Sequence, residues 1–441
     1  MSLFCLFCST EDLNDFNAMQ KVRKALSLLI FLPNITPFAA VFKSEIFPWA
    51  FLYSLRKGFY LSSRYWQFLI YMGISALFVL ATGKAEFMGV MRSGFALLNA
   101  SIPLFVVLIV TQMDFDRLKK GFYWVFGIHG LLCLMQITGL VPDFVGSVMN
   151  LFIIRFNTES WGLGRGVTGL FAEPSYLAVS MSYYFVFGIY LMRKSGNKVA
   201  EWILIGLLAF YQIAVIRSGT GMVYLLLVFL MLPKPKYILP IIAVMLIGLV
   251  IAASFAKDYE NSPRSLHLLY NLIYEQRYKD FYKFALSESG FRMVSVMGAF
   301  NYGFTHPFGS GIGAWGPASI ESLESVGLPA TEFGYFVTYY GGMFEGLRPA
   351  SFFADVLLEL GWVGAILFLR FLWPMIRFAR FFTDQASRPL MVLFLFNILF
   401  LGTIGDPVPY IFLGLFCRME LGELRWQLVD VDHENTETDG K

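Results

Sequence analysis

Apolar residues along this chain gather into runs of about 20, separated by short polar segments. A helix of this length crosses the hydrocarbon layer of a bilayer, and it satisfies its backbone hydrogen bonds within its own segment. The pattern therefore predicts membrane-crossing helices near residues 25–42, 67–82, 94–112, 121–140, 170–192, 200–216, 218–232, 237–256 and 352–372.

Two further apolar segments are less regular. The segment 46–55 is short and contains Pro48. The segment 389–417 would be about 42 Å long as one helix at about 1.5 Å per residue, which is too long for a single crossing. Its run Asp406-Pro407-Val408-Pro409 predicts a break in the middle. The segment is therefore expected to form either two short helices that meet at this turn or a re-entrant pair.

The basic residues suggest how the chain is oriented, because lysine and arginine in short loops favour the cytoplasmic side. Six basic clusters fall on alternate loops, and all six lie inside if both irregular segments cross the membrane twice. The expected fold is all-α: a polytopic integral membrane protein with about 12 transmembrane helices, between about 10 and 12, and one large external loop.

This topology divides the chain into five parts. They are a cytoplasmic N-terminus (1–24), an N-terminal transmembrane bundle (25–256), a large external loop (257–350), C-terminal transmembrane helices (351–418) and an acidic, disordered cytoplasmic tail (419–441). The external loop is too long to be a simple connection. Its mixture of aromatic, charged and glycine residues predicts short amphipathic helices over the outer face.

The composition agrees with a lipid environment. Hydrophobic residues make up 57% of the chain and charged residues 15%, whereas about 25% charged is usual in soluble domains. The formal net charge of +3 lacks the basic excess of a nucleic-acid-binding protein, so no nucleic acid partner is expected. The four cysteines include Cys5 and Cys8, but no second pair or histidine cluster completes a zinc site. No metal is expected.

Several arginines lie on the side that this topology makes external, against the usual bias. Arg165 lies in the outer loop 141–169, Arg217 lies between two apolar helices, and Arg292 lies in the large loop. Any one of them could simply contact lipid headgroups or pair with an acid. Arg217 differs, because a guanidinium at a junction of apolar helices is costly unless it faces a polar cavity or a partner. The planar fork of arginine suits a phosphate or diphosphate.

Two other residues are candidates for chemistry. Glu173 precedes Pro174 at the start of an apolar helix, where its carboxylate could complement the helix N-terminus or serve as a base or sugar ligand. His306 opens a glycine-rich stretch in which the backbone could approach a ligand closely. A histidine beside aromatic rings would suit a sugar, although such a stretch is otherwise only a flexible loop.

Four polar residues stand within the predicted helices. His129 and Gln136 are interpreted as hydrogen-bonded packing residues. Asp355 and Glu359 are four residues apart and share one helix face, which marks the inward side of that helix. The sequence does not support a proton role for this pair.

The order of these motifs resembles the bacterial O-antigen and exopolysaccharide polymerases, a superfamily shared with the O-antigen ligases. Four segments between about 165 and 364 carry the resemblance. They are Arg165 with Gly169-Leu170-Phe171-x-Glu173-Pro174-Ser175-x-Leu177-Ala178, then Arg217-Ser218-Gly219-Thr220-Gly221, then Arg292 with His306-Pro307-Phe308-Gly309-x-Gly311-x-Gly313, and Ser351-Phe352-x-x-Asp355-x-x-x-Glu359-Leu360-Gly361-x-x-Gly364.

The resemblance implies glycosyl transfer at the outer face of the bacterial inner (cytoplasmic) membrane. A polyprenyl-diphosphate-linked oligosaccharide would be the donor, and a second lipid-linked repeat unit would be the acceptor. Such an enzyme would need no cofactor, and its partners would be these substrates, membrane lipid and a chain-length regulator. Arg165, Arg217 and Arg292 would contact diphosphate or glycan, and Glu173 or His306 would be the base.

Two alternatives remain open. The ligases of this superfamily carry a histidine at the step into the last of these helices, where this chain has Pro349-Ala350-Ser351, so the sequence favours a polymerase over a ligase. A transporter or flippase of lipid-linked oligosaccharide would also place polar groups inside a bundle. The long external loop argues against it, because alternating access needs functional groups on both faces.

Overall fold

The computed structural model describes part of the chain in detail. The described residues are 24–32, 35, 49, 52, 62–109, 112–141, 143–153, 166–231, 238–255, 257, 270–271, 273–275, 291–326, 346, 348–378, 387–402 and 404–419. Within these ranges the chain is helical and forms no β-strand. The predicted all-α class is confirmed for this part of the chain.

Helices occur at each of the long apolar runs that the described residues cover. Their bounds are α4 (Ser63–Thr82), α5 (Phe87–Ile109), α6 (Gln112–Ile137), α7 (Asp143–Phe152), α8 (Pro174–Lys194), α9 (Lys198–Phe210), α10 (Gly219–Met231), α11 (Ile238–Ser254), α14 (Phe291–Thr305), α15 (Trp315–Glu324), α17 (Phe352–Phe378) and α18 (Arg388–Phe396). π-Helical turns at Tyr211–Ile216 and Asn397–Leu401 extend α9 and α18. A further helix spans Val408–Met419.

Four of the described helices are long and apolar enough to cross a membrane. They are Ser63–Thr82, Pro174–Lys194, Lys198–Ile216 and Phe352–Pro374, and shorter apolar helices lie at Gly219–Met231, Arg388–Leu401 and Val408–Met419. These helices are compatible with a multi-pass membrane protein. The total of twelve crossings and the external position of 257–350 stay predictions, and the segment 46–55 lies almost entirely outside the described residues.

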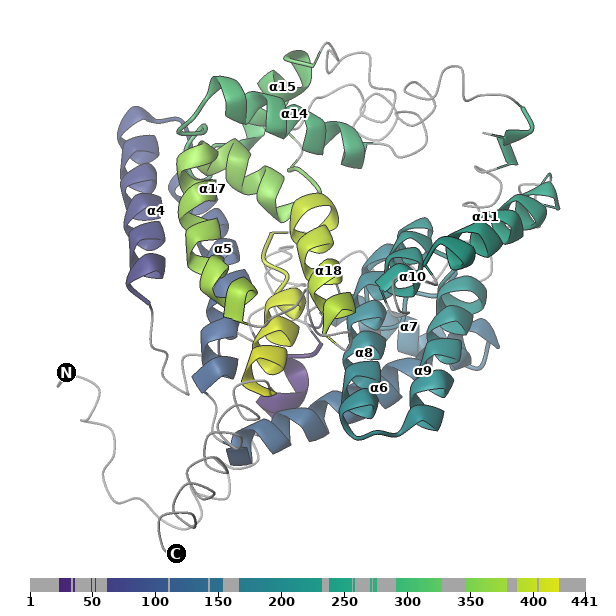
Figure 1. Ribbon diagram of the computed structural model, residues 1–441. Coiled ribbons are helices and arrows are strands. Elements are labelled where there is room, and N and C mark those ends of the chain that lie inside the picture. The colour runs from purple at the N-terminus through teal and green to yellow at the C-terminus, as the bar shows by residue number, and fades with distance from the viewer. Residues whose placement is uncertain are drawn as a thin grey trace, which may run out of the picture.

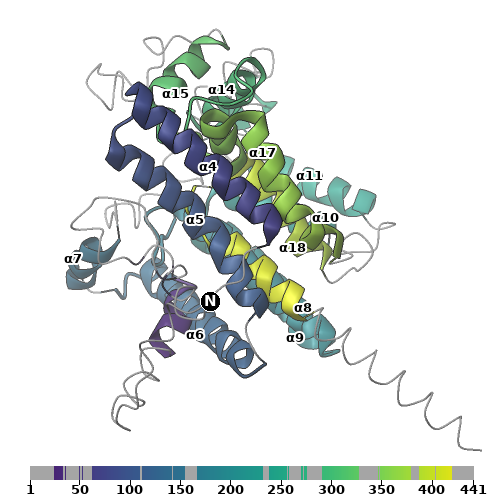
Figure 2. The same cartoon turned by 90° about the vertical axis from the view of Figure 1, so that its left-hand side faces the viewer.

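The helices form two groups. In Figure 1, α4, α5 and α17 lie on one side of the molecule and α6, α8 and α9 on the other, with α18 and the helix Val408–Met419 between them. The view in Figure 2 shows α4, α5 and α17 running together. α14 and α15, which belong to the predicted external loop, lie together at one end of the first group and contact α17.

α17 is broken near its first third. Gly361 has φ 62° and ψ −167°, a backbone conformation open essentially to glycine alone. In Figure 1 the helix changes direction: its first part lies next to α14, and its second part runs beside α4. The second part packs on α4 through aromatic pairs, with ring centroids 4.8 Å apart for Tyr65 and Phe371 and 5.3 Å for Phe68 and Phe368. It is about 25 Å long at about 1.5 Å per residue.

The backbone groups released by this break are bonded by the glycine-rich segment 306–314. The amides of Ser310 and Gly311 donate to the carbonyls of Leu358 (2.9 Å) and Glu359 (2.8 Å), and the Val363 amide donates to Pro307 (3.2 Å). Such bonds are obligatory where water is excluded. The segment thus closes the break in α17.

The glycines of this segment are needed for close packing. A Cβ at Gly309 would lie 2.5 Å from the Glu359 carbonyl carbon, and one at Gly311 would overlap the side chain of Val79 in α4. A Cβ at Gly313 would lie 2.6 Å from the Val90 amide nitrogen in α5. These contacts explain the three glycines without a ligand.

The break predicted at Asp406-Pro407 is confirmed. The segment 389–417 forms two short apolar helices, Arg388–Leu401 and Val408–Met419, and the Val408 amide donates to the Asp406 carboxylate (3.0 Å). The Asn99 amide of α5 donates to the Gly405 carbonyl in the turn (2.8 Å). Their crossing or re-entry of the membrane stays a prediction.

We expect Gly361→Ala to destabilise the protein by about 3 kcal/mol. The new methyl group would overlap the Pro307 carbonyl, and the positive φ angle would be strained. Thermal unfolding of the purified protein in detergent measures the loss. Gly127→Ala in α6 is the control, because a Cβ there meets nothing within 4 Å and should change stability by less than about 1 kcal/mol. Equal unfolding temperatures for the two variants would contradict the structural role of the break.

Candidate functional site

The structure brings together two of the motifs that lie far apart in the sequence. The Val167 amide donates to the Val215 carbonyl (3.3 Å). A Cβ at Gly166 would overlap the Ile216 carbonyl and would lie 3.2 Å from the Arg217 Cβ. The residue that follows Arg165 therefore lies directly against the backbone of Ile216 and close to the Arg217 Cβ.

Arg165 and Arg292 can be placed only in part. Arg165 lies outside the described residues, although Gly166 is the next residue in the chain. Arg292 is in the first turn of α14, and its side chain lies outside what is described. Contacts of these two side chains with diphosphate or glycan stay predictions.

A turn over residues 169–171 connects the Arg165 segment to α8. The Gln136 side chain in α6 accepts from the Gly169 amide (2.8 Å) and donates to the Gly169 carbonyl (3.1 Å). Phe171 is buried, and its ring centroid lies 5.3 Å from that of His129. His129 is itself buried and bonds the Val125 carbonyl through Nδ1 (3.2 Å). The interpretation of His129 and Gln136 as packing residues is confirmed.

Glu173 is the N-cap residue of α8 and has extended backbone angles. Its side chain makes no capping hydrogen bond to the helix, and Pro174 follows in the first turn. The carboxylate instead accepts from the Ser175 hydroxyl (3.1 Å). The residue is half-buried. Glu173 therefore stands at the start of α8, but its side chain is not the hydrogen-bonding cap of that helix.

Arg217 has an unusual backbone. Its φ of 53° places it in the left-handed region, and among the described residues it is the one non-glycine residue with positive φ. It ends the π-helical turn Tyr211–Ile216 and lies two residues before α10. Its Nε donates to the Ala214 carbonyl (3.0 Å), and the residue is exposed. Arginine is disfavoured in this conformation, so its presence here points to a use for the side chain.

The start of α10 packs against the start of α8. The Gln212 side chain donates to the Ala178 carbonyl and to the Ser182 hydroxyl of α8, both at 2.9 Å. A Cβ at Gly221 would lie 3.1 Å from that of Ala178. Glu173 comes five residues before Ala178 and Arg217 comes four residues before Gly221. The two candidates therefore precede helix starts that are in contact.

His306 belongs to a different part of the structure. Its ring stacks on Tyr302, with centroids 4.0 Å apart, and Nε2 lies 3.5 Å from the Glu321 carboxylate of α15. Burial, reinforced by Glu321, raises the pKa of Tyr302 to about 12. The His306 side chain is 39% exposed. It is accessible, but its contacts are with α14 and α15 and not with the Arg217 segment.

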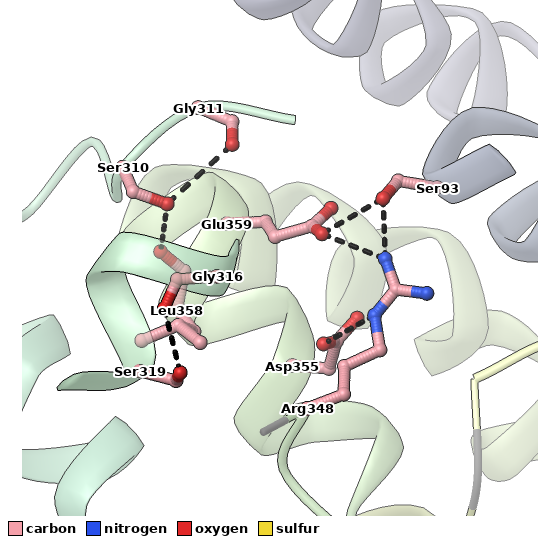
Figure 3. A network of polar contacts seen from close by, with 9 residues as sticks. All are labelled: Ser93, Ser310, Gly311, Gly316, Ser319, Arg348, Asp355, Leu358 and Glu359. Carbon is pink, nitrogen blue, oxygen red and sulfur yellow. Dashed lines mark hydrogen bonds and ion pairs between the residues drawn. The ribbon is translucent and has the colours of Figure 1, made fainter. Parts of the chain in front are cut away.

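A buried charge cluster, which the sequence reasoning missed, lies between α5 and α17. We call Ser93, Arg348, Asp355 and Glu359 the Arg348 cluster (Figure 3). Arg348 donates through Nε to Asp355 (3.1 Å) and through Nη2 to Glu359 (2.7 Å) and to Ser93. Burial opposes the charge of Arg348, but the two carboxylates outweigh it and hold its pKa above the ordinary value. The spacing of the two acids was visible in the sequence; their partner was not.

Ser351 is the last residue of the step Pro349-Ala350-Ser351, which lacks the histidine expected of a ligase. Its hydroxyl accepts from the Ala354 amide (3.2 Å) and donates to the Leu399 carbonyl (2.7 Å) in the second π-helical turn. It is fully buried. The serine therefore begins α17 and joins it to the end of α18, which is a structural role.

Substituting glycine for Arg217 separates the effect of its backbone strain on stability from the effect of its side-chain hydrogen bond. Arg217→Gly loses one hydrogen bond to Ala214, but glycine avoids the strain energy of the left-handed conformation, which is roughly 1 kcal/mol for other residues. We therefore expect an unfolding temperature equal to or above that of the wild type. Arg217→Ala keeps the strain and loses the bond, so its stability should fall by about 1 kcal/mol. Tryptophan fluorescence during thermal unfolding measures the order. A glycine variant less stable than the alanine variant would contradict the strain.

Comparison with known proteins gives no match: no protein-family model, no curated protein and no solved structure is similar to this chain. The function is therefore argued from the motifs between residues 165 and 364 and from the contacts that join them.

Proposed function

We propose that this protein polymerises polyprenyl-diphosphate-linked oligosaccharide repeat units into O-antigen or exopolysaccharide at the outer face of the bacterial inner membrane. The observation that carries the proposal is the packing of Gly166 against Ile216 and Arg217. Two short motifs of the suspected family, about fifty residues apart, meet there, and Glu173 precedes α8, whose start packs on the start of α10. This meeting is what a shared binding site for one substrate requires.

The chemistry suits the groups at this position. In glycosyl transfer the acceptor hydroxyl attacks the anomeric carbon of the donor, and the bond from that carbon to the diphosphate oxygen breaks. The electron pair leaves with the polyprenyl diphosphate, and the hydroxyl proton passes to a base. An exposed guanidinium stabilises the departing diphosphate electrostatically and can bind it through two parallel hydrogen bonds. Arg217 has this role, and Arg165, the residue before Gly166 in the chain, is its expected partner.

Glu173 is the better of the two candidate bases. It precedes the helix start that packs on the start of α10, close in sequence to the Arg165 segment, and its carboxylate accepts from the Ser175 hydroxyl. His306 lies in the separate α14 and α15 region and faces Glu321. A role for His306 and Arg292 in holding the glycan fits that position better than proton transfer at the diphosphate.

A flippase of lipid-linked oligosaccharide is the second candidate, and one observation favours it. The segment Arg388–Met419 is discontinuous: a π-helical turn ends its first part, and Asp406 caps its second part. Transporters build substrate and ion sites from broken helices of this kind. A ligase is favoured less, because the step into α17, Pro349-Ala350-Ser351, lacks the histidine expected of a ligase.

The glycan made by cells that lack the protein distinguishes a polymerase from a flippase. Complementation of these cells with Arg217→Lys tests the proposed diphosphate site. Without a polymerase, surface glycan should be reduced to single repeat units, whereas without a flippase the repeats should accumulate inside. We expect wild-type protein to restore a ladder of long chains and Arg217→Lys to restore little, because lysine keeps the charge but loses the bidentate fork. Arg193→Lys is the control: Arg193 pairs with Glu201 at the other end of α8.

The glycan is run on a gel beside a membrane blot that reports the amount of each variant. A wild-type ladder from Arg217→Lys would show that no bidentate contact is required at this position. Intracellular repeats in cells lacking the protein would favour the flippase.

Glu173→Gln tests the base. The amide keeps the size of the side chain and an acceptor for Ser175, so the protein should accumulate normally, while polymer should fall at least about 100-fold if the carboxylate takes the proton. His306→Gln should shorten or reduce the ladder without abolishing it. Quantifying repeat units per chain in both variants decides between them. Full activity of Glu173→Gln together with loss of activity in His306→Gln would assign the base to His306.

A further inference from the structure

The Arg348 cluster contains two acids and one base. Asp355 and Glu359 have side chains 1% exposed, and Arg348, at 24%, covers them (Figure 3). With all three groups ionised the cluster carries a net charge of −1 in a buried position. An uncompensated buried charge is strongly unfavourable, and two neighbouring carboxylates in such a place do not both ionise readily.

Each acid also has an oxygen that the cluster leaves unused. Asp355 Oδ2 and Glu359 Oε2 are both buried, and within the described part of the chain neither has a hydrogen-bond partner. The other oxygens are bonded: Asp355 Oδ1 accepts from Arg348, and Glu359 Oε1 accepts from Arg348 and Ser93. A buried acceptor without a donor costs roughly 1–3 kcal/mol. The two carboxylates therefore lack both a hydrogen-bond donor for these oxygens and a positive charge to balance the net charge of the cluster.

No second cation from a neighbouring element supplies this charge among the described residues. The charged groups that act on Asp355 are Arg348 and Glu359. α5 contributes the neutral Ser93. Arg92, the cation before Ser93 on α5, is exposed. Three nearby titratable groups are engaged elsewhere: Tyr71 of α4 donates to the Leu360 carbonyl, Tyr302 of α14 stacks on His306, and Glu321 of α15 faces His306.

We propose that Asp355 and Glu359 together bind one proton, so that the Arg348 cluster is neutral when the protein is folded. A proton supplies both missing elements, because the protonated oxygen is a donor and the charge becomes zero. A metal ion is a poorer fit, since it would have to approach both carboxylates beside the guanidinium that already lies between them (Figure 3). The inference does not depend on the proposed function.

The position of this proton site links it to the break in α17. Glu359 lies two residues before Gly361, and its own backbone carbonyl accepts from Gly311 of the glycine-rich segment. Arg348 also lies over the ring of Trp315 at the start of α15, 5.2 Å from its centroid. Loss of the proton would place a negative charge where α5, α17 and this segment meet.

Infrared spectroscopy of the purified full chain in lipid nanodiscs tests the proposal. A protonated carboxylic acid gives a C=O stretching band that an ionised carboxylate lacks. We expect one such band at neutral pH that is missing from both Glu359→Gln and Asp355→Asn, because the single acid left beside Arg348 ionises. Glu321→Gln, an exposed acid paired with His306, should keep the band.

The same samples test whether a sodium ion, and not a proton, occupies the Arg348 cluster. Thermal unfolding in sodium chloride and in choline chloride should give equal midpoints, and Glu359→Gln should unfold within a few degrees of the wild type. Absence of the band from the wild type, its persistence in both single variants, or a midpoint that rises with sodium would each overturn the proposal. Glycan polymerisation is not part of this test, so its outcome is separate from that of the proposed function.

Discussion

The break in α17 at Gly361 is the constraint on which this part of the structure depends. A helix that is interrupted in an environment without water must find other partners for its carbonyl and amide groups. Here the Leu358, Glu359 and Leu360 carbonyls are bonded by Ser310, Gly311 and Tyr71. The glycine-rich segment and α4 are therefore attached to α17 through its own backbone. This attachment holds α14, which leads into the glycine-rich segment, against α17.

The two well-described arginines that stand out in this chain are used differently. Arg348 is surrounded by two carboxylates and a hydroxyl, so its charge is compensated within the protein. Arg217 is exposed, and its guanidinium makes one bond to a nearby backbone carbonyl. A charged ligand would meet a neutralised group at Arg348 and an available one at Arg217. The proposed anion binding therefore falls to the Arg217 end, next to Gly166.

The sequence predicted those features that depend on local chemistry. Long apolar runs became helices such as α4 and α8, and Asp406-Pro407 became a break because proline cannot continue the helix. The break at Gly361 was not predicted, since Glu359-Leu360-Gly361 resembles the interior of an apolar helix and its partners lie about fifty residues earlier. α7, inside the predicted outer loop 141–169, was also missed.

For the candidate site, too, the sequence predicted single motifs but not the contacts between them. The motifs at Arg165, Glu173 and Arg217 were recognised one by one, but their meeting depends on tertiary packing that no local pattern records. The glycines near His306 suggested a ligand, whereas Gly309, Gly311 and Gly313 are explained by contacts with α17, α4 and α5. The acids at 355 and 359 were seen as one helix face. Their partners, Arg348 and Ser93, lie in other segments and could not be read from spacing.

The most direct measurement is a reconstitution of the purified protein in liposomes with a polyprenyl-diphosphate-linked repeat unit as the single substrate. If the Arg217 end binds the diphosphate during glycosyl transfer, polymer should grow and one polyprenyl diphosphate should be released for each bond formed, without any nucleotide. Movement of the intact lipid-linked unit across the bilayer, with no release of polyprenyl diphosphate, would contradict the account and identify a transporter.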